Sequence, residues 1–262
     1  MSRCRILIGT SGYSFADWIG EFYPIGIKKG KMLDYYKDHF PAVEINSTYY
    51  RIPHPSVFYH MADKVPEDFE FIVKTHSSFT HEREKAEENF DRFFEAVKPL
   101  IDAGKLKGYL AQFPWSFRYS AACLKYIIDS RSRFGNIPLF VEFRNADWDR
   151  EEVYRSLKDN EIGICCVDEP RLDGLFPPRA IATTSIGYVR FHGRNERDWW
   201  KARPGSDRYN YDYKKEELAD WLKKIDMLRQ ETEKIYLFFN NCHLGQAVKN
   251  AKMMMEMMQL EF

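Results

Sequence analysis

A charged pair at the end of an apolar stretch is the first feature of this sequence that suggests chemistry. Residues 139–144 read Leu-Phe-Val-Glu-Phe-Arg, so the stretch ends in an acid and a base two positions apart. Side chains alternate between the faces of a β-strand, so Glu142 and Arg144 share one face while Val141 and Phe143 share the other. A strand that is apolar along its body and ionic at its C-terminal end is typical of a parallel barrel whose strand ends line a site.

Polar endings recur at the other apolar stretches along the chain. The strand ends carry Thr10 and Ser11; Glu44 and Asn46; Lys74 and His76; Gln112; Glu142 and Arg144; Asp168; Arg190 and His192; and Asn240 and Asn241. A single residue of this kind is most simply an ion pair where a strand emerges into water. Eight strand ends of the same character favour a shared site, because barrel enzymes hold their sites at the C-terminal ends of the strands.

The mixture of acids and bases predicts acid/base chemistry on an anionic ligand. The candidate catalytic residues are Glu142, Glu44, His192 and Asp168. Glu142 and Glu44 are the expected acid/base pair, because carboxyl groups in unlike surroundings can hold different protonation states. His192 is the alternative proton carrier. The cations favour a carboxylate, a phosphate or an acidic sugar. The candidate ligand-binding residues are Lys74, Arg144, Arg190, Asn240, Asn241, Asn46, His76 and Arg194.

A metal centre is the alternative that these residue types support only in part. Glu44, Glu142, Asp168 and His192 are suitable ligands for Mn²⁺, Mg²⁺ or Zn²⁺. The cations at the other strand ends, Lys74, Arg144 and Arg190, would repel a divalent ion. No HxH or HxxxH spacing supports a metal site either. We therefore expect no metal and no other cofactor, and keep a divalent metal as the less favoured alternative.

The segment from Arg194 to Tyr213 combines basic and aromatic residues. It contains Arg194, Arg197, Trp199, Trp200, Lys201, Arg203, Arg208, Tyr209, Tyr211 and Tyr213. Such a mixture can hold a sugar ring, a nucleotide or single-stranded nucleic acid, or it can be a solvated loop. Its position directly after His192 makes it a candidate lid over that residue. The chain has 39 basic and 39 acidic residues, and this formal net charge of zero lowers the expectation of nucleic-acid binding.

Eight apolar segments alternate with helical patterns along the chain. The predicted strands are 5–9, 42–46, 69–76, 106–112, 139–144, 162–168, 188–192 and 234–240. Pro55 is expected to open one helix, and the last helix is expected to begin near Leu244. Asn240 and Asn241, which precede that last helix, are expected to cap it rather than to aim its N-terminus at an anion.

This alternation predicts an α/β fold, a (β/α)₈ TIM barrel, formed by residues 1–262 as a single domain. Parallel strands need crossover connections, which the helical patterns supply. Residues 171–185 show no convincing amphipathic pattern, so we expect an irregular sixth crossover, and we expect long loops after strands one and seven. A doubly wound open sheet is the competing architecture, although no linker to a second domain is visible.

Cysteine content and hydropathy indicate a cytoplasmic protein. The 5 cysteines are an odd number without a CxxC pair, which indicates reduced thiols rather than disulfides or a zinc site. The first strand begins too early to leave room for a signal peptide, and no apolar stretch is long enough to span a bilayer. We therefore expect no membrane partner, and the sequence leaves the oligomeric state open.

Seven short motifs, each found once, follow one another along the chain. They are Gly9-Thr10-Ser11-Gly12, Val43-Glu44-Ile45-Asn46, Ala111-Gln112-Phe113-Pro114, Val141-Glu142-Phe143-Arg144, Val167-Asp168-Glu169-Pro170, Arg190-Phe191-His192-Gly193-Arg194 and Phe238-Phe239-Asn240-Asn241. Together they resemble the YecE-like proteins, domain-of-unknown-function family 72. The resemblance implies a TIM barrel and no established activity. The family's barrel is similar in architecture to xylose-isomerase-like and endonuclease-IV-like enzymes, a likeness of fold that says little about function.

These observations predict an enzyme with hydrolase-like acid/base chemistry on a small anionic, phosphorylated or sugar-like ligand at the C-terminal mouth of the barrel. Two alternatives stay open. One is a metal-dependent phosphoesterase or an endonuclease-IV-like nuclease, although the histidines and acids of such a zinc cluster are not evident. The other is a non-catalytic protein that binds a ligand, or binds nucleic acid through the segment from Arg194 to Tyr213.

Overall fold

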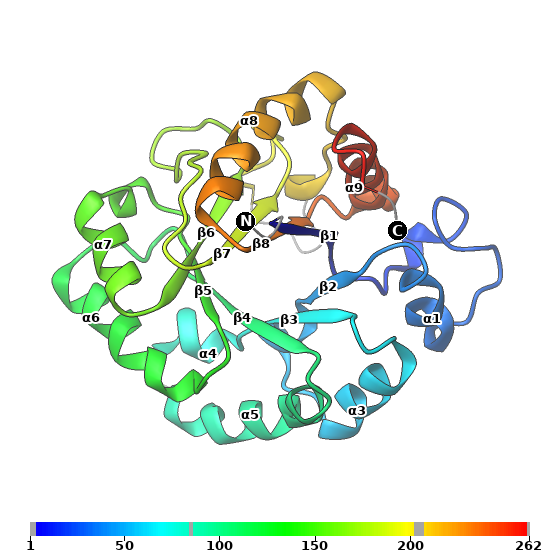
Figure 1. The fold of residues 1–262 in the computed structure, drawn as a ribbon, viewed down its shortest axis with the longest axis horizontal. Coiled ribbons are helices and arrows are strands. Elements are labelled where there is room, and N and C mark those ends of the chain that lie inside the picture. The colour runs from blue at the N-terminus through cyan, green and yellow to red at the C-terminus, as the bar shows by residue number, and fades with distance from the viewer. Residues whose placement is uncertain (1–3, 84–85, 202–206, 261–262) are drawn as a thin grey trace.

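The strands form a closed parallel barrel, which confirms the expected TIM-barrel architecture. The computed structural model describes residues 4–83, 86–201 and 207–260. The strands are β1 (Arg5–Ser11), β2 (Ala42–Ile45), β3 (Glu70–Lys74), β4 (Leu106–Gln112), β5 (Leu139–Glu142), β6 (Ile162–Asp168), β7 (Ile186–Phe191) and β8 (Lys234–Phe239). Each strand pairs with the next one in the chain, and β8 pairs with β1 to close the ring (Figure 1).

The helices surround the strands on the outside of the barrel, as Figure 1 shows. They are α1 (Met32–Tyr36), α2 (Ser47–Tyr50), α3 (Pro55–Lys64), α4 (Ser77–Thr80), α5 (Ala86–Asp102), α6 (Ala121–Ser130), α7 (Glu151–Asp159), α8 (Lys215–Glu231) and α9 (Gln246–Met257). None of the helices in the described part of the chain combines the length and apolar character that crossing a bilayer requires.

The connections confirm two features expected from the sequence. Residues 169–185, between β6 and β7, contain no helix, so the sixth crossover is irregular. Long segments follow β1 and β7, and the second of these includes residues 202–206, among them Arg203, which lie outside the described residues. Both segments leave the C-terminal ends of their strands, so they belong to the face of the barrel where the polar strand ends gather.

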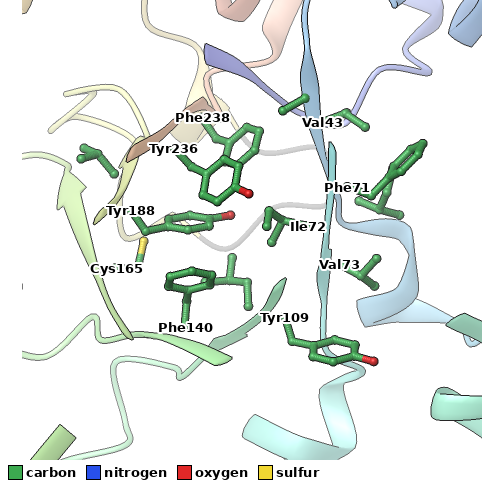
Figure 2. Packing of buried hydrophobic residues seen from close by; sticks show 14 of the residues in the cluster. Val43, Phe71, Ile72, Val73, Tyr109, Phe140, Cys165, Tyr188, Tyr236 and Phe238 are labelled. Carbon is green, nitrogen blue, oxygen red and sulfur yellow. The ribbon is translucent and has the colours of Figure 1, made fainter. Parts of the chain in front are cut away.

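The barrel interior is filled by aromatic side chains that alternate along the strands with outward-facing apolar residues. Figure 2 shows Phe140, Tyr188, Tyr236 and Phe238 pointing into the space between the strands, toward Ile72. The rings of Phe140 and Tyr188 have centroids 4.7 Å apart. This layer is a packed core rather than a channel, so a ligand can approach only from an end of the barrel.

The N-terminal end of the barrel is closed by an ion cluster. Glu70 is almost fully buried and accepts hydrogen bonds from Arg5 at 3.0 Å and from Lys234 at 2.9 Å. The hydroxyl of Tyr236 also donates to Glu70. Because these three donors satisfy the Glu70 carboxylate, we interpret the cluster as structural. A candidate functional site is therefore expected at the opposite, C-terminal end of the barrel.

One helix begins at the residue predicted from the sequence, and the start of the last helix corrects a prediction about its cap. Pro55 opens α3 as expected, and the side chain of His54 caps that helix by accepting a hydrogen bond from the Ser56 amide. The last helix begins at Gln246, after Gly245 in the left-handed conformation. The prediction that Asn240 and Asn241 cap it was wrong, because a short 3₁₀ turn separates them from the helix.

Gly9 permits the close approach of β1 to β2 and carries the first testable prediction. A Cβ atom on Gly9 would lie 2.2 Å from the Ala42 carbonyl oxygen, which is backbone and cannot rotate away. We expect Gly9→Ala to lower the free energy of unfolding by about 1–3 kcal/mol, measured by urea denaturation. Gly187→Ala in β7 is the control, since its added methyl first meets an Ile235 side-chain atom at 3.2 Å. Equal losses in the two variants would contradict this account.

Candidate functional site

An arginine at the end of β7 joins two carboxylates from different strands inside the barrel. Arg190 donates to Glu44 of β2 at 2.6 Å and to Glu142 of β5 at 2.6 Å. The second carboxylate oxygen of Glu44 accepts a hydrogen bond from the Tyr188 hydroxyl at 2.5 Å. All four side chains are fully buried or nearly so. Barrel closure therefore brings residues far apart in the sequence into contact, as expected.

Glu142 is the centre of this network. Its carboxylate also pairs with Arg144 at 2.8 Å and contacts the Nε2 atom of His192 at 3.1 Å. Arg144 continues the chain of charges to Glu169, at 2.6 Å. On the other side of the imidazole, the Asn240 amide lies 3.0 Å from the Nδ1 atom of His192. One network thus links residues of β2, β5 and β7 with residues that directly follow β5, β6, β7 and β8.

The groups of this network hold different protonation states. Although burial disfavours its charge, the guanidinium groups of Arg144 and Arg190 hold the pKa of Glu142 well below its usual range. Burial and the charge of Arg144 hold the pKa of His192 well below its usual range, so its ring is neutral. The nitrogen facing the carboxylate then carries the proton. Burial raises the pKa of Glu169 to about 8, against the opposing effect of Arg144.

Both candidate members of the acid/base pair have their oxygen atoms occupied. Glu44 binds Arg190 and Tyr188, and Glu142 binds two arginines and His192. Neither carboxylate is exposed. A general base needs a free lone pair within reach of the ligand, so the catalytic assignment of Glu44, Glu142 and His192 stays a prediction.

A pocket of about 270 Å³ opens at the C-terminal mouth of the barrel, beside this network. Its lining residues are Tyr49, Tyr50, Lys74, His81, Gln112, Pro114, Trp115, Arg144, Leu175, Trp199, Trp200, Arg208 and Tyr209. These described residues include one lysine, two arginines, one histidine, several aromatic rings and no carboxylate. Arg144 is the one member of the buried network that also lines the pocket.

Two cations of the pocket lack an acidic partner among the described residues. The Lys74 ammonium donates to the side-chain oxygen of Gln112 at 2.8 Å and lies 4.4 Å from the centre of the Tyr49 ring. The Arg208 guanidinium lies 5.4 Å from the Trp199 ring, and its buried Nε atom has no hydrogen-bond partner. By contrast, Arg144 is balanced by carboxylates at both ends. Arg208 therefore gives the pocket an unbalanced positive charge, and Lys74, whose pKa burial lowers to about 7, adds a second one in its protonated form.

Asp168 lies outside the ring in which the sequence analysis placed it. Its carboxylate accepts two hydrogen bonds from Arg194, at 2.8 and 2.7 Å, and one each from Tyr213 and Trp221. These partners lie in the segment after β7 and in α8, on the outer side of the barrel. The expected place of Asp168 in the ring was wrong, because alternation along β6 turns Val167 and Glu169 inward instead. The proposed roles of Asp168 in catalysis and of Arg194 in ligand binding stay predictions.

The remaining predicted ligand-binding residues lie around the pocket rather than in its wall. His76 caps α4 through the Ser78 amide, and Asn46 precedes α2 without capping it through its side chain. Asn241 donates to the Tyr211 carbonyl at 2.8 Å and so holds the segment after β7. Asn240 contacts His192 instead of the pocket. Their roles in binding a ligand stay predictions.

The structure adds residues that sequence reasoning missed. Tyr49, His81 and Trp115 follow strands β2, β3 and β4 and line the pocket. Each of these residues lies several positions beyond the end of a strand, where strand alternation no longer predicts the direction of a side chain. Glu169 could have been found, since it continues the two-residue spacing of Cys165 and Val167, whose side chains point into the barrel. His81 adds no charge, because burial and the nearby Lys74 lower its pKa to about 4.

The segment after β7 covers the mouth. The Tyr209 ring has its centre 6.0 Å from that of the His192 imidazole. Trp199, which belongs to the same segment, is almost fully buried. This placement agrees with the expected lid over His192. It also explains why His192 does not line the pocket.

The acids at the mouth do not fit a metal ion. Glu44 and Glu142 give their oxygens to arginine, tyrosine and histidine donors. Across residues 4–83, 86–201 and 207–260, no group of three or more His, Cys, Asp and Glu side chains is arranged to hold a metal. A divalent ion would need some of these ion pairs to break first.

Comparisons with known proteins agree over nearly the whole chain. The family model described as "Protein of unknown function DUF72" matches residues 7–262. UPF0759 protein YunF of Bacillus subtilis (strain 168) is 32% identical, over 98% of this chain and 96% of its own. UPF0759 protein YecE of Escherichia coli (strain K12) is 23% identical, over 92% of this chain and 88% of its own.

Solved structures give the same result. A DUF72 family protein of Thermotoga maritima MSB8 superposes with a TM-score of 0.89 at 42% identity, covering 97% of this chain and 99% of that one. A DUF72 family protein of Enterococcus faecalis V583 superposes with a TM-score of 0.87 at 28% identity, covering 98% and 96%. None of these names states a reaction.

Proposed function

Because this chain belongs to the DUF72 family, whose function is unknown, we propose a function from the site itself: an enzyme that acts on a small anionic, phosphorylated or sugar-like ligand at the mouth of the barrel. The chemistry we propose is hydrolase-like acid/base catalysis. The observation that carries the proposal is the pocket of about 270 Å³ whose wall, as far as the described residues form it, holds Lys74, Arg144 and Arg208 and no carboxylate.

The charge of the pocket supports an anionic ligand. Arg208 presents a guanidinium group without an acidic partner among the described residues, and planar guanidinium groups bind phosphate and carboxylate through paired hydrogen bonds. Its Nε atom is buried and unpaired, which leaves a donor for a ligand oxygen to satisfy. Lys74, which also lines the pocket, supplies a second positive group in its protonated form.

The aromatic part of the wall supports a ligand with a ring or an apolar face. Trp115 and Trp200 meet at a centroid distance of 5.4 Å, and both are partly exposed at the mouth. Tyr49, Tyr209 and Trp199 complete the aromatic surface. Sugar rings commonly pack on such surfaces, while the small volume of the pocket limits the ligand to roughly the size of a monosaccharide phosphate.

Proton transfer is best supported for Lys74, which lines the pocket, and for Glu169, which contacts the pocket residue Arg144 without lining the pocket itself. The pKa of Lys74 is lowered to about 7, first by burial and then by Arg190. Glu169, whose pKa is raised to about 8, contacts Arg144 and has one carboxyl oxygen without a partner. Groups that titrate near neutrality exchange protons efficiently. The proposal therefore assigns proton transfer to these two residues, with Glu142 holding Arg144 and His192 in position.

Binding of phosphorylated and neutral probes tests the proposal. We expect inorganic phosphate and ribose 5-phosphate to bind in isothermal titration calorimetry, and ribose to bind at least about tenfold more weakly. Arg208→Met should weaken ribose 5-phosphate binding by about tenfold or more, the usual effect of losing a charged hydrogen bond. Phosphorus NMR of the same mixtures would report hydrolysis as a new inorganic phosphate signal.

Arg197→Met is the matched control. Arg197 lies in the same segment, is exposed and does not line the pocket. Its replacement removes the same net charge, so an equal loss of affinity in both variants would mean that only the general field attracts the anion. That result, or no binding of either phosphorylated probe, would overturn the proposed function.

A further inference from the structure

Lys74 combines an accessible amine with an unusual absence of acidic partners. It is the last residue of β3 (Glu70–Lys74), and its side chain lines the pocket at the barrel mouth. The amine has one hydrogen bond, to Gln112. No carboxylate in the described part of the chain lies within 4.0 Å of it, whereas lysines such as Lys98 and Lys125 pair with aspartates.

A second buried lysine shows what a structural role looks like. Lys105 is 8% exposed, and its ammonium donates to the backbone carbonyls of Ala62 and Val65, both at 2.7 Å. Those backbone acceptors hold the Lys105 side chain in the interior, and Lys105 is not among the residues that line the pocket at the barrel mouth. Lys74 differs on both counts, since it has a single side-chain acceptor and opens into a pocket.

The charges around Lys74 favour the neutral amine. Burial lowers its pKa to about 7, and the cations Arg190 and Arg144 act in the same direction against Glu142 and Glu44. The other titratable groups among the described residues that line the pocket are Tyr49, Tyr50, His81, Arg208 and Tyr209, none of them acidic at neutral pH. A free amine in a desolvated, cationic setting is a nucleophile toward carbonyl carbon.

We propose that the Lys74 amine forms an imine with an aldehyde or ketone that also carries an anionic group. This inference rests on the proposed function and narrows its substrate class, because open-chain sugar phosphates and keto acids have this chemistry. Arg208 would bind the anionic end while the carbonyl carbon lies against Nζ of Lys74. Both groups line one pocket of about 270 Å³, so one small molecule can contact both.

The step balances without any other reactant. The Nζ lone pair forms a bond to the carbonyl carbon, and the carbonyl oxygen takes one proton from the nitrogen. The resulting carbinolamine loses this oxygen as water together with the second N–H proton, and a carbon–nitrogen double bond forms. One carbonyl compound is consumed and one water molecule is released, with no change of oxidation state.

Reductive trapping tests this inference on the full chain. Glycolaldehyde phosphate is added with sodium cyanoborohydride, whose hydride converts the imine to a stable secondary amine, and mass spectrometry locates the adduct. We expect one adduct, on Lys74, formed at least about tenfold faster than with glycolaldehyde, which lacks the phosphate. Because the neutral amine reacts, the rate should rise with pH and reach half its maximum near pH 7.

Two variants and one comparison keep the result interpretable. Lys74→Arg retains the positive charge but should give no adduct at the pocket, while Lys98→Arg, at an exposed pair on α5, should leave the adduct unchanged. If ribose 5-phosphate binds in calorimetry but no adduct forms on Lys74, the imine is refuted and the proposed function stands. If phosphorylated probes fail to bind at all, both fail. Adducts spread over exposed lysines alone would also overturn the inference.

Discussion

Replacing Glu142 with Gln is expected to lower the free energy of unfolding by about 3–5 kcal/mol, since the change leaves buried cations without their shared anion. Glu142 is fully buried and pairs with Arg144 at 2.8 Å and Arg190 at 2.6 Å. A glutamine keeps one acceptor and turns an amide NH₂ toward N–H donors. For a chain of this size the loss corresponds to a fall in Tm of roughly 6–20 °C, measured by calorimetry.

The pH dependence of this loss has a definite sign. The pKa of Glu142 is lowered in the folded state, so its contribution to stability is present above the ordinary value of 4.5. It is lost as the pH falls through the folded-state value. The Tm difference between the wild-type protein and Glu142→Gln should therefore be constant between about pH 6 and 8 and shrink at acidic pH. A difference that grows on acidification would contradict this assignment.

Glu169→Gln is the matched control, because Glu169 also contacts Arg144 but has the opposite pKa shift. Its pKa is raised to about 8, so folding of the wild-type protein loses stability as the pH rises from 4.5 to about 8. A glutamine cannot ionise and avoids this loss. We expect the variant to be as stable as the wild-type protein at neutral pH, or more stable, while Arg144 keeps Glu142 as its partner.

The existence and order of all eight strands could be predicted from the sequence because burial on both faces leaves a plain apolar signal, while the ends of six of the strands differ from the prediction by one or two residues. Residues 106–112 and 162–168 were predicted with the bounds that the structure gives to β4 and β6. Alternation also predicted that Glu142 and Arg144 share a face, and both turn inward to one ion pair. The resemblance to the YecE-like family was likewise confirmed.

The residues that line the pocket could not be predicted in the same way. The prediction placed Asp168 inside the barrel because it assigned the last residue of each strand to the site, although alternation from Cys165 turns Glu169 inward instead. Trp115 and Tyr49 lie in short connections, where side-chain direction depends on local turns rather than on a period. The lack of an acidic partner for Lys74 depends on which neighbouring strand ends face it, and this is a property of the closed barrel.

Asp168→Asn is the second change expected to have a large effect, and it separates a positioning role from a catalytic one. Asp168 is almost fully buried and ties Arg194, Tyr213 and Trp221 to the end of β6. An asparagine loses the charge that Arg194 faces and one of the acceptor sites. We expect a loss of about 3 kcal/mol, or roughly 6–12 °C in Tm.

The same change should loosen the segment that carries part of the pocket wall. Arg194 and Tyr213 flank the residues that include Arg208 and Tyr209, so amides 207–213 should exchange faster with deuterium in Asp168→Asn. Asp147→Asn is the control, because Asp147 pairs with Arg118 at the surface and the loss of such an exposed pair should leave stability nearly unchanged. Unchanged exchange and stability in Asp168→Asn would remove the positioning role and return Asp168 to the candidates for direct contact with the ligand.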